Sequence, residues 1–137
     1  IYLTDVENRS AAVKRQAATM PPLQLSIEKV GVFPDLRRPR VLWVGTRGDV
    51  EKLIALQKRL EEEFAVIGFP AENRPFRAHL TLGRIKDARS AAGVGEALKK
   101  HADFSAGEFQ ATELILFQSK LSPQGATYTK LATFPLG

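Results

Sequence analysis

An alternation of polar and apolar side chains near the middle of the chain constrains the fold most tightly. Residues 77–84 read Arg-Ala-His-Leu-Thr-Leu-Gly-Arg, the period-two pattern of a half-buried β-strand. Side chains two positions apart on a strand point to the same face, so the pattern predicts that His79 and Thr81 share one face. Leu80 and Leu82 are then expected on the opposite face, in the core.

Two arginines extend this polar face in the sequence. Arg77 lies two positions before His79 and is expected on the same face by the same parity. Gly83 interrupts the alternation, and a glycine inside a strand often marks a β-bulge. A bulge at Gly83 would turn Arg84 toward the face of His79. The simpler interpretation is an ordinary outward face, because charged and polar side chains are common on surfaces.

The rest of the chain alternates between helical and strand-like patterns. One helix is expected to begin at Asp49, a residue type that caps helix N-termini, and to end at Gly68, a common C-terminal cap. Apolar residues recur between them at spacings of three and four. The turn-forming residues 122–125 predict a hairpin. In full, helices are predicted at residues 6–20, 50–67 and 90–101, and strands at 23–33, 41–44, 77–84, 112–120 and 126–134.

Composition narrows the class of protein. The 137 residues suit one domain with a real core. The chain has no cysteine, which excludes disulfides and thiolate metal sites and is compatible with a reducing cytoplasm. A net charge of +5 favours anionic partners, including nucleic acid. The basic residues are denser around the histidine strand, at Arg74, Arg77, Arg84, Lys86 and Arg89.

Longer stretches in the same order resemble a known family. Residues 69–84 resemble the second signature of the 2H, or two-histidine, phosphoesterases. The closest likeness is to their RNA 2',3'-cyclic phosphodiesterases, also called 2'-5' RNA ligases or LigT-like proteins. Four further stretches resemble the same branch, at residues 30–34, 38–45, 116–121 and 128–136.

The resemblance implies an α+β fold with two lobes, in which antiparallel sheets surround a central cleft and helices lie outside. It implies hydrolysis of 2',3'-cyclic phosphate ends to 2'-phosphates, with reversible 2'-5' ligation, without a metal or other cofactor. It assigns acid–base chemistry to His79, phosphate hydrogen bonding to Thr81 and charge stabilisation to Arg84. Arg77 is added as a substrate-binding residue from strand parity alone. The expected partner is RNA or a nucleotide with a 2',3'-cyclic phosphate. The protein is expected to be a cytoplasmic monomer that does not associate with membranes.

The chain departs from the family pattern in one respect. The family carries two His-x-Thr motifs, whereas this chain has one. The other histidine, His101, is followed by Ala102-Asp103-Phe104 and is expected to be structural or exposed. We therefore expect residues 1–137 to be an N-terminally incomplete single domain, with the first motif upstream.

Three other functions are compatible with this sequence. A non-catalytic RNA-binding module would keep the basic surface without a second proton-transfer group, and a structural domain would rely on a partner lobe. A ribonuclease forming cyclic phosphates would need two acid–base groups, as the phosphodiesterase does. A first histidine upstream would speak against the binding module, whereas assays must separate the two enzymes.

Overall fold

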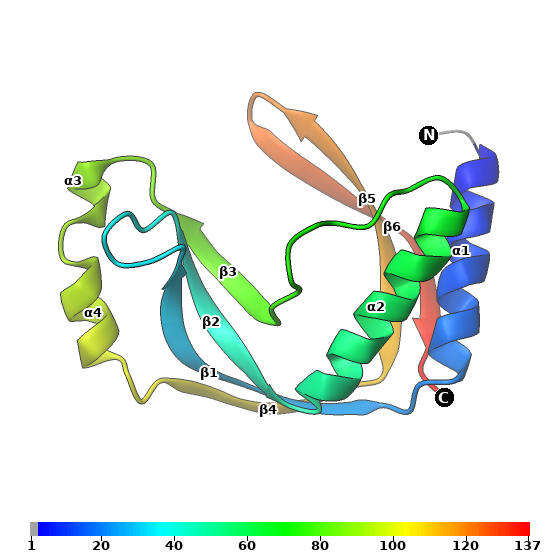
Figure 1. Cartoon of the computed structure of the whole chain (residues 1–137), viewed down its shortest axis with the longest axis horizontal. Helices are drawn as coiled ribbons and strands as arrows, with labels where there is room; N and C mark the ends of the chain where they lie inside the picture. Colours follow the sequence, from blue (N-terminus) through cyan, green and yellow to red (C-terminus); the bar gives the residue numbers. More distant parts are fainter. Residues whose placement is uncertain (1–2) are drawn as a thin grey trace. The chain divides into compact units, whose positions relative to one another are not determined.

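The computed structural model describes residues 3–137, which divide into two compact units (Figure 1). The first unit comprises residues up to Leu23 together with Ile54–Pro75 and Ala111–Gly137, and the second comprises Gln24–Leu53 and Phe76–Gln110. The elements in chain order are α1 (Leu3–Ala18), β1 (Leu23–Phe33), β2 (Val41–Gly48), α2 (Val50–Val66), β3 (His79–Arg84), α3 (Ala88–Ala91), α4 (Val94–Lys100), β4 (Ser105–Ala111), β5 (Glu113–Ser122) and β6 (Gly125–Pro135).

In the first unit, α1 packs against the hairpin of β5 and β6. Small residues on α1 permit this close approach, because Ala12 and Ala17 are almost completely buried. The backbone N–H of Gly137 donates to the carbonyl of Ala17 and joins the C-terminus to the helix. Arg15 on α1 forms an ion pair with Glu63 on α2. Leu56, only 1% exposed, is the most deeply buried side chain of α2.

In the second unit, four strands form a sheet in the order β3-β2-β1-β4 (Figure 1). The pairs β1–β2 and β2–β3 are antiparallel, so β3 is an edge strand. The Asp49 carboxylate accepts the backbone N–H of Gln24 at 2.8 Å and pairs with Lys52. Its predicted position at the start of a helix is confirmed, and its carboxylate also connects that helix to β1.

These elements confirm the predicted α+β class with antiparallel sheets. The predicted strand at residues 23–33 and the hairpin around residues 122–125 are present. Gly68 follows α2 with a φ of 96°, as expected for a glycine that ends a helix.

Several boundaries differ from the sequence predictions. The helix predicted at 90–101 is two short helices, because Gly93 takes a φ of 81° and interrupts the hydrogen-bonded turns. The N-cap is Asp87 rather than Ser90, whose backbone N–H donates to the Asp87 carboxylate. The strand predicted at 41–44 continues to Gly48, and β4 was not predicted.

Candidate active site

The site expected from the sequence lies on β3, and the register of this edge strand arranges its side chains. Directly opposed residues of antiparallel strands project to the same face. His79 is paired with Gly45 and Thr81 with Trp43, both on β2. The predicted shared face of His79 and Thr81 is therefore confirmed. His79 is half-buried, whereas Thr81 is exposed.

A β-bulge adds Arg84 to this face. Thr81 opposes Trp43 and Gly83 opposes Leu42, so Leu82 is the extra residue without a partner. An extra residue inverts the alternation beyond it. Arg84 pairs with Val41, two residues from Trp43 on β2, and so belongs to the face of His79 and Thr81. The expected bulge is present, one residue earlier than the glycine that suggested it.

One hydrogen bond fixes the orientation and the tautomer of the His79 ring. Its Nδ1 lies 2.6 Å from the carbonyl oxygen of Arg77. A carbonyl can only accept a hydrogen bond, so Nδ1 carries the proton and donates. In the neutral ring the lone pair is then on Nε2. The histidine thus presents Nε2 as a base, or Nε2–H as an acid once the ring is protonated.

Two aromatic side chains hold the imidazole on the sheet. The Phe33 ring meets the His79 ring edge-on, with centroids 5.0 Å apart and an interplanar angle of 89°. The Trp43 ring lies 5.2 Å from Phe33. Trp43 rests on Gly31, where an added Cβ would lie 2.2 Å from its Cζ2 atom. The absence of a side chain at Gly31 thus makes room for the ring.

Arg77 precedes the strand rather than belonging to it, so strand parity does not by itself place its side chain on the face of His79. β3 begins at His79. The Arg77 guanidinium nevertheless lies 5.6 Å from the centroid of Phe33, within the range of a cation–π contact. Arg77 therefore positions His79 in two ways. Its carbonyl accepts the hydrogen bond from Nδ1, and its guanidinium lies near the Phe33 ring, which contacts the imidazole.

The predicted core positions of Leu80 and Leu82 were wrong. These side chains are 53% and 59% exposed. An edge strand has a neighbour on one side only, and nothing in its alternation reveals whether its apolar face is covered. The second histidine, His101, follows α4 as its C-cap and is exposed, which confirms its expected location.

Sequence reasoning gave no role to Phe33, Trp43 or Gly31. Each lay in a stretch that resembled the family, but none was connected to His79. The available signal was alternation within residues 30–33 and 41–44, which groups Gly31 with Phe33 and Val41 with Trp43. The missing information was the register between these strands.

The described part of the chain offers no group of three or more His, Asp or Glu side chains suited to a metal ion. Among residues 3–137, no helix is long and apolar enough to cross a membrane.

An imidazole with a free Nε2, a hydroxyl and a guanidinium on one strand face define a site for acid–base chemistry on an anion. The family model described as LigT like Phosphoesterase matches residues 44–128. The chain belongs to this family, which confirms the family and the class of enzyme predicted from the sequence.

Relatives with curated functions agree with this assignment. The RNA 2',3'-cyclic phosphodiesterase of Archaeoglobus fulgidus is 35% identical over 98% of this chain and 76% of its own length. That of Methanothermobacter thermautotrophicus is 36% identical over 84% of this chain and 61% of its own length. The chain thus covers less than two thirds of the second relative.

Solved structures match the whole described fold. E. coli LigT complexed with 3'-AMP superposes with a TM-score of 0.73 at 26% identity, covering 99% of this chain and 71% of that one. The TT0787 protein of Thermus thermophilus gives a TM-score of 0.70 at 26% identity, covering 99% and 72%.

Proposed function

We propose that this protein is an RNA 2',3'-cyclic phosphodiesterase that hydrolyses terminal cyclic phosphates to 2'-phosphates. Water attacks the phosphorus, the bond from phosphorus to the 3'-oxygen breaks, and a proton passes to that oxygen. With an RNA 5'-hydroxyl in place of water, the same exchange joins two strands by a 2'-5' linkage. The names of the relatives and the 3'-AMP complex of E. coli LigT support an RNA or nucleotide substrate.

The observation that carries this proposal is the bond from His79 Nδ1 to the Arg77 carbonyl. It leaves Nε2 to move a proton to or from the reacting oxygens, a role that suits an imidazole near neutral pH. Thr81 donates a hydrogen bond to a non-bridging phosphate oxygen, and Arg84 offsets the charge that develops there. Arg77 is proposed as a positioning residue. The reaction needs a base for the attacking water and an acid for the leaving oxygen, and His79 can serve as only one of them at a time. We assign the other role to none of the described residues.

We expect activity on 2',3'-cyclic substrates to survive a strong chelator. The proposed roles of His79, Thr81 and Arg84 supply proton transfer and charge stabilisation from protein groups, and the resemblance implies chemistry without a metal. Hydrolysis of 2',3'-cyclic AMP by the full chain should be measured with and without EDTA. Loss of turnover in EDTA that a divalent ion restores would falsify the metal-independent proposal. Tight RNA binding without turnover would favour a non-catalytic module.

We expect RNA affinity to fall steeply with salt. Neutralising phosphates with basic side chains releases condensed counterions, and for single strands log K falls with log[salt] by about 0.7 per phosphate contacted. Arg84 and Arg77 are both exposed beside His79. Fluorescence anisotropy with a labelled oligoribonucleotide ending in a cyclic phosphate gives the slope. A flat dependence would remove these arginines from the binding surface.

We further propose that both units belong to one phosphoesterase domain, since the family model runs through residues of each. We also propose that the enzyme is monomeric and cytoplasmic. The chain's lack of cysteine suits a reducing compartment. Light scattering on the full chain and fractionation of the source cells test these two statements.

A further inference from the structure

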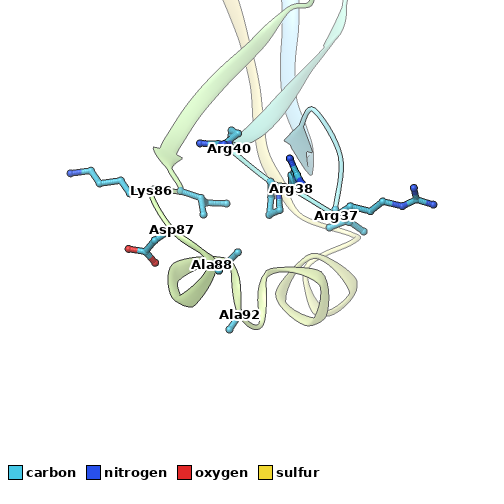
Figure 2. A pocket seen from close by; sticks show the side chains of 11 residues that line it. Arg37, Arg38, Arg40, Lys86, Asp87, Ala88 and Ala92 are labelled. Atoms are coloured by element: carbon cyan, nitrogen blue, oxygen red, sulfur yellow. The ribbon is translucent and has the colours of Figure 1, made fainter.

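A cavity of about 420 Å³ lies within the second unit, beyond the end of β3 (Figure 2). One side is the loop of residues 36–40 between β1 and β2, and the other is residues 85–92, which follow β3. His79 and Thr81 are not among its lining residues. The cavity is therefore separate from the candidate active site but begins one residue after Arg84.

The rim of the cavity is strongly basic. Arg37, Arg38, Arg40 and Lys86 line it, and none of them forms an ion pair within the described part of the chain. Figure 2 shows Arg38 and Arg40 near one another, with Arg37 and Lys86 reaching outward in opposite directions. Basic lining residues without ion-pair partners, with Arg38 and Arg40 close to the hollow, favour an anionic occupant.

The single acidic group on the rim is already engaged. The Asp87 carboxylate accepts the backbone N–H of Ser90 at 2.7 Å. This hydrogen bond lowers the pKa of Asp87. The carboxylate is thus engaged in stabilising the start of α3.

Backbone hydrogen bonds fix the conformation of the loop of residues 36–40, called the arginine loop below. The Asp35 carboxylate accepts the backbone N–H groups of Arg37 and Arg38, at 2.8 and 3.1 Å. The N–H of Arg40 donates to Phe33, and the N–H of Ile85 donates to Arg40, each at 2.8 Å. The cavity is thereby fixed to the ends of β1 and β3, the strands that carry Phe33 and His79.

The remaining lining is apolar, with Leu36, Pro39, Ile85 and alanines of α3 and its C-terminal flank. A volume of about 420 Å³ falls in the range of about 300–1,000 Å³ seen for small-molecule sites. A basic rim over an apolar lining matches a nucleotide, whose phosphate is charged and whose base has a flat, weakly polar face.

We propose that this cavity binds a nucleotide unit of the RNA strand upstream of the terminal cyclic phosphate. The inference rests on the proposed function, because it extends the substrate from its reactive end. The cavity begins beyond Arg84, the group proposed to bind the reacting phosphate, and His79 and Thr81 are not among its lining residues. The next nucleotide of an oligonucleotide can enter it, whereas a cyclic mononucleotide bound at His79 has no second nucleotide to place there. The cavity therefore selects RNA ends over free cyclic nucleotides.

The test compares two substrates of the full chain, 2',3'-cyclic AMP and an oligoribonucleotide ending in a 2',3'-cyclic phosphate. In the variant Arg38→Gln/Arg40→Gln we expect kcat/KM for the oligonucleotide to fall about tenfold or more, since the variant loses charge-assisted hydrogen bonds to the RNA strand. Hydrolysis of cyclic AMP should stay within about twofold, because a mononucleotide at His79 loses neither of these charged contacts. Lys100→Gln removes an exposed charge of the same unit outside the cavity and should change neither value.

An equal fall on both substrates would overturn the proposal, because the arginines would then act on the chemical site. No change on the oligonucleotide would overturn it as well. If the full-length protein hydrolyses neither substrate, the proposed function fails, and anisotropy with the same oligonucleotide still tests the cavity. Weaker binding by Arg38→Gln than by Lys100→Gln would then support it. Competition by inorganic phosphate as effective as that by 5'-AMP would reduce the cavity to a phosphate site and contradict the nucleotide assignment.

Discussion

Replacing His79 with alanine is expected to lower kcat on 2',3'-cyclic substrates by about a hundredfold or more, the lower end for loss of a general acid or base. The ring is held by the Arg77 carbonyl at Nδ1 and by the edge-on contact with Phe33, so its Nε2 is prepositioned. Alanine removes the proton-transfer group while leaving β3 paired through its backbone. KM should change little. Steady-state kinetics on the full chain measure both values.

Variants of neighbouring residues place this loss in context. Thr81→Ala and Arg84→Ala should lower the same parameter by less, because each removes one phosphate contact rather than the proton-transfer group. His101→Ala is the matched control, since His101 is exposed at the end of α4. If His101→Ala were the crippling change, the site assignment on β3 would be wrong.

The arrangement on β3 could be predicted because it depends on local geometry. Alternation alone sets the shared face of His79 and Thr81, and a glycine out of phase indicates a bulge. Those two rules were sufficient to bring Arg84 to the same face. Arg77 fell outside their reach, because the strand begins two residues after it.

The position of Phe33 depends on a β-bulge in β1 that the sequence does not predict. Strict alternation over residues 23–33 would group Phe33 with Leu25 on the buried face. The register shifts between Glu28 and Val30, where Lys29 takes a φ of 69°. Such a conformation is uncommon outside glycine, so nothing in a lysine predicts it. Beyond the bulge Phe33 changes face and meets His79.

The missed strand β4 has a similar explanation. Residues Ser105–Ala111 include Gly107 with a φ of 95° and few residues with high β-propensity. The strand forms beside β1 in the sheet order, and the backbone N–H of Lys29 donates to Phe104 just before it. Pairing with an existing strand therefore outweighs its weak local preference. The arginine loop likewise became a candidate site only once the fold brought residues 85–92 opposite it.

Gly31→Ala is expected to lower the free energy of unfolding by about 1–3 kcal/mol, the usual penalty for overpacking. The new methyl group would lie 2.2 Å from Cζ2 of Trp43 and 2.5 Å from its Cη2, far inside van der Waals contact. The movement of the indole is restricted, because the Phe33 ring lies beside it with ring centroids 5.2 Å apart. Urea unfolding of the full chain, followed by tryptophan fluorescence, measures the change.

Gly31→Ala should also lower kcat, because it disturbs the side chains that position His79. Displacing Trp43 pushes on Phe33, whose ring is in edge contact with His79. Misplacement by about 1 Å can slow a reaction about a hundredfold, and we expect kcat to fall about tenfold here. Gly95→Ala is the matched control, because no atom lies within 4 Å of its added Cβ and alanine is favoured over glycine in a helix by about 0.5–1 kcal/mol.

A second substitution tests whether the effect of Gly31→Ala comes from the steric clash between the new methyl group and the Trp43 ring. Trp43→Phe shortens the ring that the methyl group meets and removes the indole N–H, which is buried without a hydrogen-bond partner among the described residues. In a double-mutant cycle, contacting residues couple by about 0.5–3 kcal/mol. We therefore expect Gly31→Ala to destabilise the Trp43→Phe background much less than the unaltered chain. An additive cycle would mean that Gly31 and Trp43 do not constrain each other, and the proposed route from Gly31 to His79 would fail with it.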